Sequence, residues 1–290
     1  MAKKNKEENT EAKADLPDKT EVIEEEALIE KPKEGLSTEL GEIKEIEEVV
    51  VEEAKKKGSF EKESWKPKTS LGVKVKSGEI ASIDYILDKR IKILEPEIVD
   101  ALLPNLSTDL LMVGQSKGKF GGGQKRVFKQ TQKKTQEGNK PKFATFAVVG
   151  NENGYIGMGY GKSKETVPAR EKAIRQAKLN VIKIRRGCGD WGCGCMDAHT
   201  VPFKVHGKAG SVEVILIPAP KGTGLKIEKE CQKVLKLAGI KDVWSRTEGH
   251  TRSKLNLLYA CFKALQSLVQ FKLKQESLVS LNVIEGNYGK

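Results

Sequence analysis

The stretch FATFAVVGNENGYIGMGYGKSKETVPAREKA, residues 143–173, decides the fold. Its first seven residues are an apolar run typical of a buried strand, and the segment Gly150–Gly154 predicts a turn. Glycines then alternate with larger residues along 155–161, which predicts a second strand with one face free of side chains. Small apolar residues recur at helical spacing along 169–181, and Thr166 is the expected N-cap of that helix. Two strands joined by a turn therefore lead into a long helix.

The bare glycine face leaves two uses open, because either a helix or an RNA backbone could approach it closely. Lys162 and Lys164 follow at the junction between strand and helix, where helix amides favour phosphate. The sequence from Gly161 to Ser163 is similar to the end of a phosphate-binding loop. Ile156 stands where that loop requires its first glycine, so we do not expect a nucleotide site.

Elements upstream extend this pattern. A helical pattern runs along 95–104, and 109–113 predicts a short strand or a helical turn. Basic and polar residues alternate along 126–133, which predicts a strand with one wet face. Glycine, asparagine and proline predict a hairpin turn at 136–141. Residues 95–182 therefore predict a helix, three antiparallel strands and a long helix.

A second α+β unit follows a cysteine-rich loop. Strands are expected at 201–205 and 211–217, joined through 206–210, and a helix, a short strand and a long helix at 255–268 complete the unit. The expected divisions of the chain are 1–60, a disordered acidic extension; 61–94, a lead-in segment; 95–186, the first domain; 187–200, the cysteine-rich loop; 201–270, the second domain; and 271–290, a tail.

Charge is distributed unevenly along the chain. Residues 1–60 hold 11 Lys and 18 Asp or Glu, a net charge of −7, and too few apolar groups to bury a core. Residues 117–186 hold 18 Lys or Arg and 4 acidic residues, a net charge of +14. A solvated face is the plain alternative for a charge run. So much like charge among glycines and aromatics favours a polyanionic partner instead.

Cysteine and histidine usage excludes several classes of protein. The five cysteines are an odd number and three lie within eight residues, which argues against a secreted disulfide framework and for a reducing, cytoplasmic setting. The start, MAKKNKEENT, lacks the apolar core of a signal peptide, and no apolar run of about 18 residues predicts a membrane span. The three histidines form no recognised catalytic pattern, so we do not expect an enzyme.

The opening stretch closely resembles the signature of the universal small-subunit ribosomal protein S5 family, called S2 in eukaryotes. The similarity continues through AKLNVIKIRRGCGDWGCGC (177–195), HTVPFKVHGKAGSVEVILIPAPKGTGL (199–225) and LAGIKDVWSRTEGHTRSKLN (237–256), and the cysteine-bearing loop is similar to archaeal members. The resemblance implies an α+β fold. A double-stranded-RNA-binding-like α-βββ-α domain would be followed by the family's second α+β domain with its βαβ crossover. The acidic extension, the insert 118–125 and the C-terminal tail depart from the family pattern.

The resemblance also implies a function. The protein would be a structural constituent of the small ribosomal subunit that binds 16S rRNA. It would lie between ribosomal proteins of the S4 and S8 families, near the mRNA entry channel, and would support 30S assembly and decoding accuracy. The hairpin loop Lys133–Lys142 would reach rRNA, and the segment His206–Leu225 would face the S4-like neighbour. A free-standing double-stranded-RNA-binding regulator is the alternative.

Candidate site residues follow from charge and from the resemblance. Basic groups at turns, strand ends and helix faces are the RNA-binding candidates, because RNA helices are recognised through shape and backbone. They are Lys129, Lys133, Lys134, Lys140, Lys142, Lys162, Lys164, Arg170, Arg175, Arg185 and Arg186. The protein-interface candidates, which the resemblance implies, are His206, Lys208, Lys221 and Thr223.

A possible metal site lies in the cysteine-rich loop, at Cys188, Cys193, Cys195 and His199. Three thiolates and one imidazole complete a closed tetrahedral zinc site. The single residue between Cys193 and Cys195 is tighter than a C-x2-C knuckle, and the alternative is that these are small, semi-buried loop residues. One structural zinc ion is the only cofactor expected. A zinc-dependent hydrolase is not expected, because four protein ligands leave no open coordination position on the zinc for water or substrate.

Overall fold

The computed structural model describes residues 65–117 and 123–286. Contacts divide the chain into two units, Met1–Ser59 and Phe60–Lys290, and every element described below belongs to the second. The expected acidic extension, and the centre of the basic loop at 118–122, lie outside the described residues.

A five-stranded antiparallel sheet is built around one long central strand. Its strands are β1 (Ser107–Leu111), β2 (Lys129–Thr135), β3 (Gly138–Gly150), β4 (Tyr155–Ser163) and β5 (Val181–Lys183). β1 and β2 follow one another along one edge of β3, β4 pairs with the other edge, and β5 pairs with β4. The three expected strands are present, and β1 and β5 widen the sheet. Residues 109–113, for which a short strand or a helical turn was expected, overlap strand β1.

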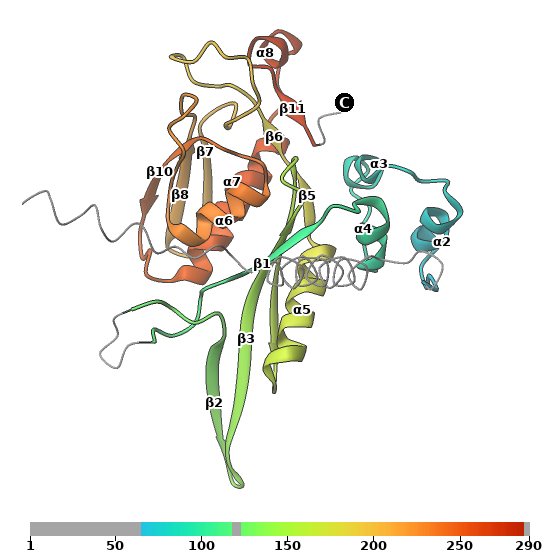
Figure 1. The fold of residues 1–290 in the computed structure, drawn as a ribbon, viewed down its shortest axis with the longest axis vertical. Helices are drawn as coiled ribbons and strands as arrows, with labels where there is room; N and C mark the ends of the chain where they lie inside the picture. Colours follow the sequence, from blue (N-terminus) through green and yellow to red (C-terminus); the bar gives the residue numbers. More distant parts are fainter. Residues whose placement is uncertain (1–64, 118–122, 287–290) are drawn as a thin grey trace, which may run out of the picture. The chain divides into compact units, whose positions relative to one another are not determined.

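Helix α5 (Thr166–Leu179) lies along one face of this sheet (Figure 1). Gly157, Gly159 and Gly161 lie beneath it, and a Cβ added at any of the three would approach the α5 backbone to 2.2 Å. The prediction that a helix packs closely on the glycine face is therefore confirmed. The prediction that an RNA backbone approaches this face is wrong, because α5 covers it. The N-cap is Glu165, whose backbone is extended, so the prediction of Thr166 was one residue too late.

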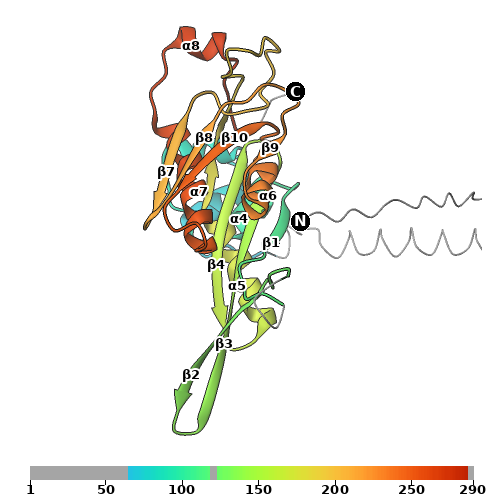
Figure 2. The ribbon, with the colours of Figure 1, turned by 90° about the vertical axis from the view of Figure 1, so that its left-hand side faces the viewer.

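The β2–β3 hairpin extends beyond the rest of the sheet (Figure 2), and its turn is shorter than predicted. Only Gln136 and Glu137 lie between the paired strands. Pro141 lies inside β3, opposite Gln132. Strand β4 ends opposite Phe143, so within the described residues no strand pairs with this side of β3 at Pro141. The proline is tolerated there because its missing N–H removes no hydrogen bond between strands.

Three short helices precede or flank the sheet: α2 (Ser70–Ser77), α3 (Ile83–Asp88) and α4 (Glu97–Leu102). Helix α4 is the helix expected at 95–104. Trp65, Ile86 and Ile98 are buried in one apolar cluster, to which β4 contributes Tyr155. The Tyr155 hydroxyl donates to Asp84 at 2.8 Å, which ties α3 to the sheet.

The second sheet has the order β7-β8-β10-β9, with a parallel pair at one edge. Its elements are β7 (Val205–Ala209), β8 (Val212–Ile217), β9 (Leu225–Lys226), α6 (Lys229–Leu237), β10 (Val243–Glu248) and α7 (Lys254–Gln270). The parallel strands β9 and β10 are joined through α6, which is the βαβ crossover that the resemblance implied. The strand predicted at 201–205 was wrong, because strand pairing begins only at Val205. Most of the predicted connection 206–210 is strand, and only Gly210 and Ser211 form the turn.

The C-terminal segment returns to the first half of the unit. Helix α8 (Gln275–Ser280) is followed by β11 (Ile284–Glu285), which pairs with β6 (Arg185–Arg186). A single apolar core also joins the two sheets, since Phe146 of β3 and Ile156 of β4 are buried in the same cluster as Leu258 of α7. Among the described helices, none combines the length and apolar composition that a membrane crossing requires.

Candidate nucleic-acid interface and metal centre

Five exposed lysines share one face of the first sheet, the face opposite α5. Strand register places them there, because lateral neighbours on adjacent strands point to the same side. Lys129, Ala144 and Lys162 form one lateral row across β2, β3 and β4. Lys133 and Lys140 are direct partners in another row. The five are Lys129, Lys133, Lys140, Lys142 and Lys162, and we call this group the basic face.

The basic face carries uncompensated charge. Lys140 pairs with Glu137 at 2.6 Å, but both side chains are more than half exposed, so the pair is weak. Within the described residues the other four lysines form no ion pair. Like charges directly opposite on paired strands are destabilising, as at Lys133 and Lys140. An anionic partner would remove that repulsion.

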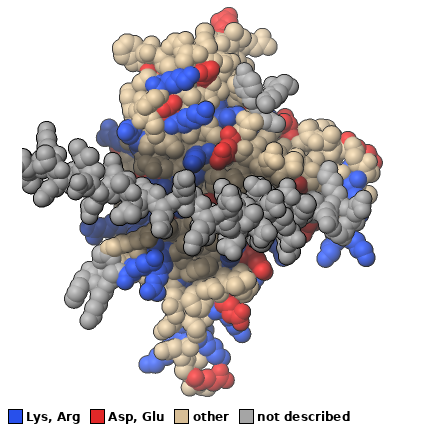
Figure 3. All heavy atoms as spheres, in the orientation of Figure 1, with Lys and Arg blue, Asp and Glu red and all other residues tan. Residues whose placement is uncertain are grey.

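Four further candidates lie exposed on the side of the sheet that α5 covers. Lys134 is opposite Asn139 and so points away from the basic face. The other three lie in or just before α5: Lys164, Arg170 and Arg175. Basic side chains therefore lie on both sides of the β2–β3 hairpin, with acidic atoms at its tip and beside its upper part in the view of Figure 3.

Arg185 and Arg186 do not belong to this surface. Arg186 is 6% exposed, and its guanidinium donates to Asn153 Oδ1 at 3.0 Å and to the carbonyl oxygen of Gly286 at 3.1 Å. Burial lowers the pKa of Arg186. Arg185 donates to the carboxylate of Glu285. Both guanidinium groups hold the C-terminal segment, so we leave them out of the proposed RNA-binding set.

The protein-interface candidates lie on two segments. His206 and Lys208 are exposed on β7 and both pair with the carboxylate of Glu213 on β8. These two neighbours lower the pKa of Glu213, and Lys208 has the larger effect. Lys221 and Thr223 lie in the loop before β9. The Lys221 ammonium is paired with a carboxylate of the cysteine-rich loop and remains more than half exposed.

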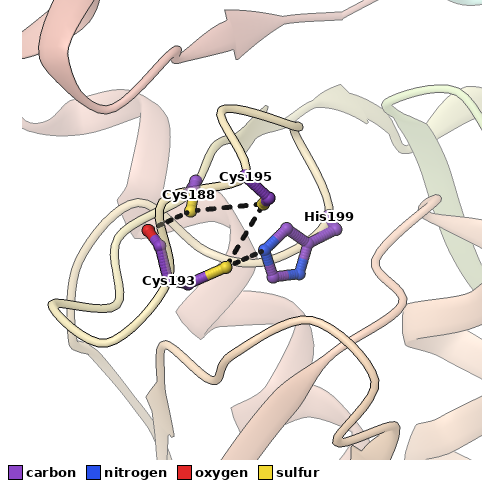
Figure 4. A group of neighbouring side chains, drawn as sticks. All are labelled: Cys188, Cys193, Cys195 and His199. Carbon is purple, nitrogen blue, oxygen red and sulfur yellow. Dashed lines mark hydrogen bonds between the residues drawn. The ribbon is translucent and has the colours of Figure 1, made fainter.

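The four potential metal ligands lie together (Figure 4). One ligand atom from each of Cys188, Cys193, Cys195 and His199 lies within 4.8 Å of the others. The Cys188 Sγ is 3.7 Å from the Cys195 Sγ, and the Cys193 Sγ is 3.7 Å from His199 Nε2. A tetrahedral site with Zn–S bonds of about 2.3 Å has sulfur atoms about 3.7 Å apart. The Cys188–Cys195 distance matches this value, and the Cys193 Sγ is closer to the Cys195 Sγ, at 3.2 Å. The three sulfur atoms and the imidazole are the soft donor set that zinc prefers.

The surroundings of Cys193 and Cys188 shift the pKa values of these two thiols in opposite directions. Hydrogen bonds from the backbone amides of Lys221 and Cys195 lower the pKa of Cys193 to about 6, which favours its thiolate at neutral pH. Burial, reinforced by the neighbouring sulfur atoms, raises the pKa of Cys188 to about 12. A bound cation would favour the thiolate form of both, because metal coordination deprotonates thiols.

One residue of this centre was missed by sequence reasoning. The carboxylate of Asp242 lies 2.8 Å from Nδ1 of His199, and both side chains are almost fully buried. Histidines that bind metals commonly use their second nitrogen in this way. No local pattern could have found Asp242, since it lies 43 positions from its partner.

Comparisons with known proteins agree on one family. The family profile described as ribosomal protein S5, N-terminal domain, matches residues 124–185, and that of the C-terminal domain matches 207–277. The chain is 49% identical to the small ribosomal subunit protein uS5 of Nanoarchaeum equitans over 212 residues, covering 73% of this chain and 91% of that protein. It is 46% identical to the uS5 protein of Methanocaldococcus jannaschii over 227 residues, covering 78% and 98% of the two chains.

Proposed function

Because the chain belongs to the ribosomal protein S5 family, we propose specific roles for its surfaces within the small ribosomal subunit. The protein is a structural constituent of that subunit in the cytoplasmic ribosome, where it binds rRNA and associates with ribosomal proteins. It is not an enzyme.

The basic face is the proposed rRNA-binding surface, together with Lys134, Lys164, Arg170 and Arg175 around the same hairpin. The single observation that carries the proposal is the alignment of exposed lysines on one sheet face, two of them directly opposite each other. Lysines of this kind bind phosphates through charge, so each neutralised phosphate contributes to a steep dependence of affinity on salt. The partner is 16S rRNA, recognised through its backbone and shape.

Binding of a 16S rRNA fragment against salt concentration tests this surface. Replacing Lys133, Lys140 and Lys142 with alanine should reduce the slope of log affinity against log salt by about 0.7–0.9 for each phosphate that the protein no longer neutralises. The matched control removes three exposed lysines outside the hairpin, at Lys74, Lys92 and Lys226. Equal reductions in both variants would show that only net charge matters, and would reject the assignment.

The protein-binding side is proposed to be the β7–β8 hairpin and the loop before β9, with His206, Lys208, Lys221 and Thr223 facing a neighbour of the S4 family. The resemblance of the segment His206–Leu225 supports this role, as it supports an S8-family neighbour, a place near the mRNA entry channel and an effect on decoding accuracy. The test is a misreading reporter in cells carrying Lys221→Glu. An error rate equal to that of the wild type would remove Lys221 from the interface.

The four-residue centre is proposed to hold one structural Zn²⁺ ion. Its support is the cluster of three sulfur atoms and one imidazole nitrogen that lie within 4.8 Å of one another, with Asp242 behind His199. The ion would crosslink the loop that connects the two halves of the unit. Elemental analysis of the purified protein should find about one zinc per chain, and less than about a tenth of an equivalent would reject the site.

A further inference from the structure

The carboxylate of Asp242 connects the metal centre to a second loop. One oxygen, Oδ2, lies 2.8 Å from Nδ1 of His199. The other, Oδ1, accepts hydrogen bonds from the backbone amides of Gly222 at 3.1 Å and Gly224 at 2.7 Å. Asp242 is 4% exposed, and its bond to His199 is buried, whereas its two bonds to the loop amides are partly buried.

That second loop, residues 218–224, precedes β9 and carries Lys221 and Thr223. No neighbouring group packs against the two glycines of its tip, because a Cβ added at Gly222 or Gly224 would meet no atom within 4 Å. Both glycines have positive φ angles, 92° and 72°, which most other residues adopt only with strain. The conformation of the tip therefore depends mainly on its hydrogen bonds.

A second link joins the loop to the cysteine-rich segment. The side-chain ammonium of Lys221 pairs with the carboxylate of Asp197, which lies two positions before His199. Both side chains are more than half exposed, so this pair restrains the loop only weakly. The stronger link is made by the amides of Gly222 and Gly224, which are bound to the carboxylate behind a potential ligand.

We propose that metal bound at Cys188, Cys193, Cys195 and His199 sets the conformation of the loop 218–224 through Asp242. Asp242 acts as a positioning residue for both the histidine and the loop. The inference rests on the zinc site proposed above and goes beyond it: the ion organises a surface that presents Lys221 and Thr223, and is more than a crosslink within its own loop.

The orientation of His199 explains how the two sites are coupled. Its Nε2 faces the cysteine sulfur atoms and its Nδ1 faces Asp242. With a cation on Nε2, the proton of the imidazole would stay on Nδ1, and Nδ1–H would donate to the carboxylate of Asp242. Without the cation, that restraint on Asp242 and on the loop would weaken.

Hydrogen exchange of the wild-type chain before and after zinc removal tests the coupling directly. Amides of Gly222 and Gly224 should exchange at least about tenfold faster once a chelator has removed the ion, because the hydrogen bonds that protect them open more often. Amides in the centre of α7 serve as the internal control and should not change. Loss of zinc with unchanged exchange at both glycines overturns the inference while leaving the zinc site intact. A chain that contains no zinc when purified rejects both.

A pair of matched variants tests the positioning role of Asp242. Asp242→Asn keeps the size of the side chain but removes the charge that faces His199, and should weaken zinc binding by about 10–100-fold in competition with a chromogenic chelator. Asp190→Asn makes the same change in the cysteine-rich loop, at a carboxylate that accepts the Gly192 amide and no other donor among the described residues, and should bind zinc as the wild type does. Equal zinc affinities in the two variants would contradict the role of Asp242. The exchange measurement needs no variant, so it decides the question even if Asp242→Asn folds poorly.

Discussion

The basic face and the metal centre are built in different ways. The lysines of the basic face come from three neighbouring strands, and regular strand register alone places them on one side. The candidate metal centre has its four potential ligands within 12 residues, yet its supporting contacts come from Asp242, from Lys221 and from the C-terminal turn, where the Leu281 carbonyl accepts the Cys188 amide at 2.8 Å. A surface that needs only local periodicity tolerates local change, whereas a site assembled from distant segments depends on each of them.

The largest expected effect contrasts a glycine under α5 with a glycine of the metal loop. Gly159→Val should reduce the free energy of unfolding by about 4 kcal/mol or more, because even a Cβ would lie 2.2 Å from the α5 backbone. Gly194→Ala should change it by less than about 0.5 kcal/mol, since nothing lies within 4 Å of the added carbon. Urea unfolding followed by circular dichroism measures both. Similar losses in the two variants would contradict the close contact.

The next effect separates an arginine that stabilises the fold from the lysines proposed to bind RNA. Arg186→Ala should reduce the free energy of unfolding by about 2–3 kcal/mol, because it leaves the buried acceptors of Asn153 and Gly286 without their charged donor. The slope of rRNA binding against salt should not change. A smaller slope with unchanged stability would return Arg186 to the RNA surface.

The two regions should also differ in their response to pH. Zinc binds the thiolate form, and hydrogen bonds from backbone amides lower the pKa of Cys193 to about 6. Lowering the pH through this value favours the thiol, so protons compete with the metal and zinc affinity should fall by about tenfold or more per pH unit. Chelator competition between pH 7 and pH 5 measures this. Binding of rRNA by the basic face, which releases no proton, is the comparison and should change far less.

The smallest effect is expected at Trp191, whose side chain is 100% exposed in the metal loop. Trp191→Ala should leave both zinc content and the free energy of unfolding unchanged within about 0.5 kcal/mol, because the ring has no buried surface to lose. Phe146→Ala, which removes a fully buried ring from the core that joins the two sheets, is the matched comparison and should cost about 3–5 kcal/mol. A substantial loss in the Trp191 variant would mean that the metal loop depends on that ring.

Much of the fold could be predicted from the sequence because regular elements leave a local period. The alternating glycines along 155–161 predicted strand β4, and alanines at helical spacing predicted α5 and its buried face. The prediction was wrong where strand pairing, rather than residue type, decides a boundary. Residues 201–204 are apolar enough for a strand, but pairing with β8 begins only at Val205.

The sequence by itself determined the family, the order of helices and strands, the basic segment and the four candidate ligands of the proposed metal centre. Each of these follows from neighbouring residues, or from the repeats of two residues in a strand and 3.6 residues in a helix that backbone geometry imposes. Only the tertiary structure decided that α5 covers the glycine face, that Arg185 and Arg186 hold the C-terminal segment, and that Asp242 lies behind His199. Those contacts join residues dozens of positions apart, and partners brought together only by folding leave no local pattern to read.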